Sequence, residues 1–326
     1  MRTKSIFGGS IFSILIFLFS ASLAQNPLPK YDFLVSADGE ADFKTVQEAI
    51  NAVPDMRKNQ TVIFIKNGIY KEKLILPTCK TNVKLIGESV EKTIITYDDY
   101  ASKKSRFGEE IGTSGSSGFF IFGEGFTAEN ITFQNTAGPV GQAVAVRIDG
   151  DRVKFINCRF LGFQDTLYPH GDKSRQYYKN CYIEGTVDFI FGWSTAVFDS
   201  CTIFCKNAGF ATAASTLPET KYGFVFLHCK ITGDAPANSF YLGRPWRPYA
   251  KVVYLYCYID KQIKPEGWNN WDKPDAEKTS FYGEYMNTGP GADISNRVSW
   301  SHQLTADEAS AYTIPNIFGD WDPEKQ

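Results

Sequence analysis

The sequence predicts an all-β solenoid, a parallel β-helix with short helices near both ends. Three observations predict it. From about residue 60, short runs rich in β-branched and aromatic residues follow one another, separated by Gly, Asn and Asp turn residues. One motif recurs at intervals of between 20 and 28 residues. No helical period is visible between about residues 60 and 300.

The recurring motif is a turn residue followed by a small or apolar residue and a short strand. It occupies residues 129–133, 156–160, 179–183, 199–203, 227–231 and 256–259, at successive spacings of 27, 23, 20, 28 and 28 residues. An imperfect period of this length without helices is typical of a β-solenoid. A leucine-rich repeat would need a Leu pattern that is absent, and a β-sandwich would not explain the recurring Asn-Cys position.

The chain has seven cysteines, and most of them fall in this motif. Equivalent residues of successive coils stack about 4.8 Å apart, so we expect these cysteines to form a ladder of small buried side chains. Cys181 and Cys201 occupy equivalent positions in neighbouring coils, and both a disulfide and two free thiols are compatible with that spacing. No C-x-x-C pair exists and the three His are scattered, so no zinc site is predicted.

Short helices are expected near the two ends. Residues 42–54 place their apolar side chains on one face, with Asp42 as the expected N-cap, and this helix should cover one end of the body. Residues 305–308 form a capping box that should open a second helix before Pro315. Residues 261–300 are richer in Trp, Gly and Pro and are interpreted as a long loop excursion.

The N-terminus has the features of a secretory signal. A short basic region precedes an apolar run at 11–19 and a small-x-small site at 22–24. This predicts a signal peptide over residues 1–24, one domain over 25–326 and a secreted protein, extracellular or periplasmic. An uncleaved membrane anchor is the alternative. No other stretch approaches ~18 apolar residues, so we expect no membrane contact after cleavage, and a monomer is the default.

Composition limits the function classes. The chain is 43% hydrophobic and 21% charged, which permits a packed core. Its formal net charge is -2, and removing the two basic residues of the signal would make it -4. No basic block predicts nucleic-acid binding. An acidic substrate would therefore need a local binding site.

One carboxylate, Asp188, interrupts the apolar run at 185–192. A buried, unpaired Asp costs several kcal/mol or shifts its pKa, so it needs a partner or a function; capping a turn at a strand end is the alternative. Gln142, Gln164 with Asp165, and Asp188 are spaced one coil apart. The solenoid should therefore gather them into a patch on one face.

Such a patch has a definite chemistry. Two close carboxyl groups cannot both ionise easily, so one becomes an acid beside a nucleophile or base. Arg244 could keep Asp188 ionised, and the two Gln amides could donate to an oxyanion. The alternatives are a structural Gln ladder and a surface ion pair of Arg244. Trp246 and Trp268 are either core residues or sugar-binding ones.

Five motifs, in order, resemble the pectin methylesterase family. They are residues 68–72, 142–147, 162–168, 185–192 and 242–246, within a resemblance that covers roughly residues 35–322. The resemblance implies a right-handed parallel β-helix, and a carboxylic ester hydrolase that demethylates the C6 methyl esters of homogalacturonan (pectin). It implies no metal and no organic cofactor.

The same resemblance assigns roles by motif position. Asp188 is similar to a nucleophile that forms an acyl-enzyme, and Asp165 to a general acid and then base. Gln142 and Gln164 resemble oxyanion donors, and Arg244 an arginine that holds the nucleophile. The candidate substrate-binding residues are Thr113, Gln142, Tyr168, Arg244, Trp246 and Trp268.

The sequence departs from the family pattern after Gly192. Trp193 and Ser194 stand where plant members are expected to have Asn-Ala, which favours a bacterial-type enzyme. We also expect no inhibitor-like pro-region between the signal and the catalytic domain. A β-helical glycosidase or lyase of the same polymer, or a non-catalytic pectin-binding solenoid, is the alternative function.

Overall fold

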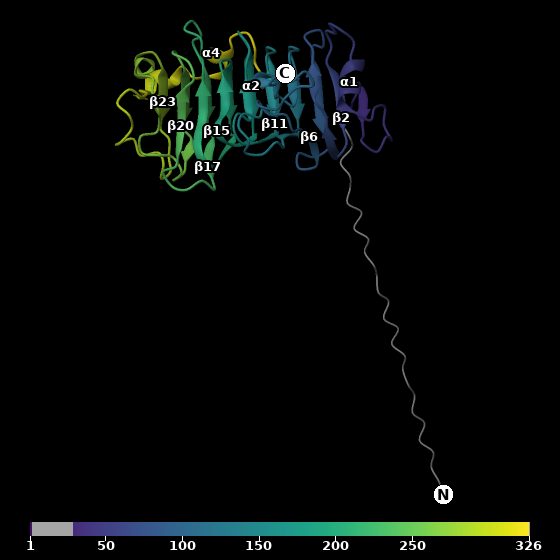
Figure 1. The fold of residues 1–326 in the computed structure, drawn as a ribbon, viewed down its shortest axis with the longest axis horizontal. Helices are drawn as coiled ribbons and strands as arrows, with labels where there is room; N and C mark the ends of the chain where they lie inside the picture. Colours follow the sequence, from purple (N-terminus) through teal and green to yellow (C-terminus); the bar gives the residue numbers. More distant parts are fainter. Residues whose placement is uncertain (2–28, 326) are drawn as a thin grey trace. The chain divides into compact units, whose positions relative to one another are not determined.

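From Tyr31 onward the chain winds into stacked coils, and all pairings between its strands are parallel. The computed structural model describes residue 1 and residues 29–325, so the signal peptide predicted over 1–24 lies outside the described residues. The strands of successive coils stand side by side across the body (Figure 1). The prediction of an all-β parallel β-helix is confirmed.

One wall of the β-helix is an 11-stranded sheet. Its strands, in spatial order, are β1 (Phe33–Val35), β2 (Thr61–Ile65), β5 (Val83–Gly87), β8 (Thr127–Glu129), β11 (Val153–Ile156), β14 (Arg175–Lys179), β16 (Thr195–Asp199), β18 (Phe224–Leu227), β21 (Lys251–Leu255), β23 (Phe281–Tyr285) and β24 (His302–Gln303).

Two further walls are joined into one sheet because β15 (Tyr182–Gly192) and β17 (Thr202–Ala214) run through both. The second wall holds β3 (Gly68–Lys71), β6 (Thr93–Tyr97), β9 (Thr132–Asn135), β12 (Arg159–Leu161), β19 (Lys230–Gly233) and β22 (Tyr258–Ile259). The third holds β4 (Leu74–Leu76), β7 (Phe119–Ile121), β10 (Val146–Ile148), β13 (Leu167–Pro169) and β20 (Phe240–Pro245). The third wall carries the candidate site.

The repeat motif marks the turn from the first wall to the second. The turn residue has a left-handed φ between 50° and 56° in all six copies, namely Asn130, Asn157, Asn180, Ser200, His228 and Tyr256. Asn adopts this conformation more readily than most residues, which explains its recurrence. The next residue points into the core and is at most 2% exposed at Ile131 and at Cys158, Cys181, Cys201, Cys229 and Cys257.

All seven cysteines are free in the structure. Of the two alternatives for Cys181 and Cys201, it contains the pair of buried thiols, with the backbone N–H of Cys181 donating to Sγ of Cys201 at 3.4 Å. Burial raises the pKa of the Cys158 thiol to about 12. The thiol ladder therefore acts as a column of small apolar side chains.

A second column inside the helix is aromatic. Phe155, Tyr178, Phe198, Phe226 and Tyr254 are register partners on β11, β14, β16, β18 and β21. Their stacked rings have centroids 5.1, 4.6, 4.5 and 4.4 Å apart in turn. Such stacks add to the stability gained from burial alone, so this column holds successive coils in register.

The helices at the ends agree with the sequence in place but not in every cap. α1 (Val46–Ala52) covers the N-terminal end, but its N-cap is Thr45, in a capping box with Glu48. The expected cap, Asp42, instead accepts from the backbone N–H of Leu34. α3 (Ala306–Ser310) opens with the predicted Thr305 capping box, and α4 (Ile314–Phe318) follows it.

The prediction of a loop over 261–300 is wrong in part, because the segment contains the 3-10 helix η1 (Pro274–Lys278) and β23. Its end is tied to the core by Arg297, which pairs with the buried Glu284 at 2.8 Å. A further short helix, α2 (Gly112–Gly115), interrupts the helix-free stretch expected between 60 and 300. No helix within residues 29–325 is long and apolar enough to cross a membrane.

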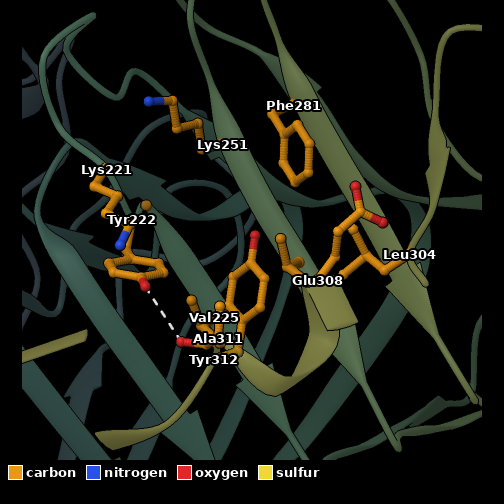
Figure 2. A pocket seen from close by; sticks show the side chains of 11 residues that line it. Lys221, Tyr222, Val225, Lys251, Phe281, Leu304, Glu308, Ala311 and Tyr312 are labelled. Atoms are coloured by element: carbon orange, nitrogen blue, oxygen red, sulfur yellow. Dashed lines mark hydrogen bonds between the residues drawn. The ribbon is translucent and has the colours of Figure 1, made fainter. Parts of the chain in front are cut away.

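The C-terminal segment runs back over the outer face of the first wall toward the middle of the body (Figure 1). Between this segment and β18, β21 and β23 lies a mainly apolar cavity of about 340 Å³ (Figure 2). Tyr222 donates to the carbonyl oxygen of Ala311 across its edge. The charged groups of its lining are Lys221, Lys251 and the carboxylate of Glu308. Its lining thus lacks the pair of carboxyl groups that the sequence predicts for the reaction site.

Candidate active site

The third wall presents an outward row of side chains at one level of the coils. Register places Arg147 beside Tyr168, and Ala213 between Phe191 and Arg244. The rings of Tyr168 and Phe191 stack with centroids 4.0 Å apart, so this contact joins the two register groups into one row. All members of this row except Arg147 line one cavity.

This cavity has a volume of about 270 Å³. It is lined by Thr113, Ser114, Gln142, Gln164, Asp165, Tyr168, Asp188, Phe191, Ala213, Arg244, Trp246 and Trp271. The structure therefore brings together every predicted site residue except Trp268. The spacing of one coil between the polar residues produces the patch that the solenoid geometry predicted.

Asp188 lies in an irregular part of β15. The register with β17 slips between Gly185 and Val187 and again between Val187 and Ile190, so Asp188 sits in a bulge with φ 54°. Bulges commonly redirect a side chain beside an active site. A Cβ on Gly185 would come within 2.5 Å of the carbonyl oxygen of Phe163, so the tight approach of the strands requires glycine there. The local sequence thus turns a carboxylate out of an apolar strand.

Arg244 holds this carboxylate with both arms of its guanidinium. Nε and Nη2 each donate to one carboxylate oxygen of Asp188 at 2.8 Å. The guanidinium lies between the rings of Phe210 and Trp271, 3.8 and 3.6 Å from their centroids. Burial raises the pKa of Asp188, and Arg244 opposes that shift by stabilising the ionised form. A weak surface ion pair does not describe this buried, stacked contact.

Asp165 is the second carboxyl group in the cavity. It is 7% exposed, has φ 64°, and makes no side-chain hydrogen bond to any described residue. Burial, and then the charge of Asp188, raise the pKa of Asp165 well above its usual range, while Arg244 offsets part of this. Asp188 is therefore the carboxyl group of the pair that ionises more readily.

The two amides stand free. In the part of the chain that the structure describes, the side chains of Gln142 and Gln164 form no hydrogen bond, although both backbones are held: the carbonyl of Gln142 accepts from Ala101 at 2.8 Å and that of Gln164 from Ala143 at 3.1 Å. Their N–H groups are therefore available to a ligand. A structural ladder would have paired the two amides with each other.

Trp268 is a correction. It is 1% exposed and donates from Nε1 to the buried Glu284, so it belongs to the core and contacts no substrate. A β-bridge pairs Trp268 with Gly243 of β20, at a position where the residues of successive coils face the core. The tryptophan that reaches the cavity is Trp271, three residues later. The sequence Gly267-Trp268-Asn269-Asn270-Trp271 offered both candidates, and only their register separates them.

A family model described as Pectinesterase matches residues 32–320. The chain belongs to the pectinesterase family. It is 45% identical to "Pectinesterase 31" of Arabidopsis thaliana over 89% of this chain and 92% of that one. Other curated relatives are longer: the chain spans 61% of "Probable pectinesterase/pectinesterase inhibitor 36" of the same plant.

Solved structures agree. The pectin methylesterase from carrot superposes with TM-score 0.82 at 38% identity, covering 91% of this chain and 96% of that one. Pectin methylesterase PemA from Erwinia chrysanthemi gives 0.79 at 31%, over 91% and 99%. The higher identity to the plant proteins does not support the bacterial-type enzyme expected from Trp193 and Ser194.

Proposed function

We propose that this protein demethylates the C6 methyl esters of homogalacturonan, giving pectate and methanol, with Asp188 as the nucleophile. The observation that carries the proposal is the unequal pair of carboxyl groups. One is gripped by Arg244, the other is buried without a partner among the described residues, and both open into a cavity that also holds two free amides. Family membership supports the same reaction.

In the first half of the reaction, an ionised oxygen of Asp188 attacks the ester carbonyl carbon. The carbonyl π electrons move to the oxygen, and the amide N–H groups of Gln142 and Gln164 stabilise this oxyanion. When the carbonyl re-forms, the bond to the methoxy group breaks and Asp165 gives its proton to the departing methanol. An anhydride between Asp188 and the galacturonate remains.

In the second half, Asp165 is a carboxylate and acts as a base. It takes a proton from water as the water oxygen attacks the galacturonyl carbon of the anhydride. Collapse releases the product as a galacturonic acid, which then loses its proton to solvent. It also returns Asp188 as a carboxylate, while Asp165 holds its proton again. Arg244 restrains Asp188 throughout, and charge and protons balance without a cofactor.

The substrate is proposed to be a polysaccharide held by the aromatic and hydroxyl groups of the cavity. Thr113, Tyr168, Trp246 and Trp271 line it beside the reacting groups. A solved structure described as pectin methylesterase in complex with hexasaccharide VII superposes on this chain with TM-score 0.79 at 30% identity, covering 91% of this chain and 99% of that one. We further propose that the protein is exported, on the basis of its N-terminal sequence.

A glycosidase is the second candidate, because paired carboxyl groups also hydrolyse glycosides. The bidentate grip on Asp188 favours the esterase, since it restrains both oxygens of a nucleophile in one orientation. The decisive experiment measures methanol release from highly methylated pectin by wild type and Asp188→Asn, and follows polymer length in parallel. Methanol release by wild type alone, at constant polymer length, is expected. Chain shortening without methanol would overturn the proposal.

A further inference from the structure

The third wall carries a second outward row of side chains. It lies two residues further along each strand than the row beside the reaction cavity. It consists of Asp149, His170, Trp193, Ser215 and Trp246, each of which directly follows the last residue of a third-wall strand: β10, β13, β15, β17 and β20. These strand ends are register partners, since Ile148 pairs with Pro169, and Ala214 pairs with both Gly192 and Pro245. The row therefore continues the site along the same wall.

Trp193 has a fixed position in this row. Gly192, with φ 136°, leaves no room for a side chain, because a Cβ would lie 2.1 Å from the carbonyl oxygen of Pro169. The backbone N–H of Trp193 donates to that same oxygen. Its ring packs on His170 with centroids 3.8 Å apart, and Nδ1 of His170 lies 2.5 Å from a carboxylate oxygen of Asp149. The indole is thus held in place before any ligand arrives.

Trp193 and Trp246 face a cavity of about 440 Å³, whose lining is mainly apolar. The two rings have centroids 6.5 Å apart, with Ser215 between them in the row. Trp246 also lines the reaction cavity, so the two cavities adjoin at this residue. The charged residue of the lining is Arg247, whose guanidinium lies 5.5 Å from the Trp246 centroid at the exposed edge.

Ser215 is a second indication that a ligand binds here. It lines the cavity, is 4% exposed, and its Oγ has no hydrogen-bond partner among the residues that the structure describes. Buried hydroxyl groups are normally paired, because leaving one unpaired costs free energy. A rotation about χ1 toward the cavity would give this hydroxyl a ligand oxygen to bind.

We propose that Trp193, Ser215 and Trp246 form a second sugar subsite, the Trp-Ser-Trp subsite, which binds a methyl-esterified galacturonate of the polymer whose other residue is reacting. This inference rests on the proposed function. The C–H faces of a sugar suit aromatic platforms, and a neutral ester enters an apolar cavity without the desolvation cost of a carboxylate. The enzyme would therefore favour stretches in which methylated residues are neighbours.

The test measures binding rather than turnover. Fully methyl-esterified and fully de-esterified oligogalacturonides of equal length are titrated calorimetrically into Asp188→Asn, with and without Trp193→Asn. We expect the second substitution to weaken binding of the esterified oligomer roughly tenfold, the loss of one stacked aromatic ring, and to leave the de-esterified oligomer within about twofold. Trp193→Phe should restore most of the difference.

The matched control is Tyr256→Asn, which removes an exposed aromatic ring from a turn where Asn is the common residue. It should change neither affinity. Equal weakening for both oligomers would overturn the proposal, and so would a larger loss for the de-esterified one, because the cavity would then select a carboxylate through Arg247. Methanol release by wild type reports separately on the proposed function, so the two failures are distinguishable.

Discussion

The same coil produces two kinds of ladder on two sides of the molecule. On the turn ladder, the column of left-handed turn residues between the first and second walls, the side chains of Asn130 and Asn157 share a 2.6 Å hydrogen bond. The residues that follow them, Ile131 and Cys158, fill the core behind them. On the third wall the outward residue changes from coil to coil, and Gln142, Gln164 and Asp165 have no side-chain partner in the described part of the chain. Two neighbouring residues of this ladder thus pair their side-chain amides with each other, whereas the site leaves its own polar groups for a substrate.

The two regions also share a backbone conformation. Asn180 has φ 52° and Asp188 has φ 54°, and both lie in the left-handed region. In the turn this conformation lets the chain pass between walls, while in the site it occurs at both carboxyl groups, Asp165 included. Left-handed residues are found at active sites as well as in turns. Substitutions in the two regions should therefore differ in their effects on turnover and on stability.

The largest effect is expected for Asp165→Asn. An amide keeps the shape but cannot transfer a proton, so turnover should fall by roughly 100- to 10,000-fold. Initial rates of methanol release measure it. The control is Asp99→Asn, which changes a buried carboxylate that is paired with Lys73 and Lys103 outside the cavity, and should leave turnover at the wild-type level in the folded protein.

The stability of Asp165→Asn relative to wild type should increase as the pH rises. The folded pKa of Asp165 is raised by burial and by Asp188, so its protonated form stabilises the fold fully below the unfolded pKa, and this contribution is lost as the pH rises through the folded pKa. The Asn side chain does not titrate, so the variant does not lose stability in this way. The melting temperature of Asp165→Asn relative to wild type should therefore be higher at pH 8 than at pH 4; a constant difference would contradict the assignment.

The next effect concerns the free amides. Gln164→Ala and Gln142→Ala each remove an oxyanion donor, and each should lower kcat by roughly 100- to 1000-fold. Gln303→Ala, at an exposed position on β24, is the control and should have no effect. If either site variant retained near-normal turnover while folded, that amide would belong to a structural ladder after all.

A smaller and pH-dependent effect is expected for Arg244→Gln. Without the guanidinium, only the weaker effect of the Lys273 charge opposes burial, so the pKa of Asp188 rises further and less of the nucleophile is ionised in acid. The acidic limb of the pH–rate profile should move to higher pH, and Arg244→Lys, which keeps the charge but not the fork, should move it less. An unchanged acidic limb in both variants would remove Arg244 from the control of the nucleophile.

The sequence predicts the stacked coils, the Cys ladder and the gathering of Asp165 and Asp188, because these follow from the period of the repeat. It does not separate Trp268 from Trp271, since the length of chain between coils varies and the pairing with Gly243 decides which ring turns inward. The bulge at Asp188 depends on the register of β15 against β17, which the sequence of β15 alone does not give.

The cap of the N-terminal helix does have a signal in the sequence. The segment from Thr45 to Glu48 is itself a capping box, and its spacing is the same as in the C-terminal helix that was predicted correctly. Asp42 is an equally good capping residue by type, but it lacks a Glu or Gln three residues later. The strand β23 within 261–300 has a weak strand signal, because its five residues include a glycine and a glutamate. The glutamate, Glu284, is buried because Arg297 of the following loop pairs with it.

The smallest effect tests the turn ladder. Asn180 has no side-chain hydrogen bond to a described residue, so replacing it reports on its left-handed backbone. Asn180→Ala should lower the free energy of unfolding by about 1 kcal/mol, because a Cβ without a compensating polar group is disfavoured in this region. Asn180→Gly should cost less, and urea denaturation measures both.

Neither Asn180 variant should change kcat, since the turn lies on the far side of the coil from the cavity lining. If Asn180→Ala were as stable as Asn180→Gly, the recurring Asn would have to be explained by side-chain stacking instead of backbone conformation. If kcat fell with stability intact, the two ladders would not be independent. The expected result, a stability change without a catalytic one, would separate the part of the repeat that builds the coil from the part that carries the chemistry.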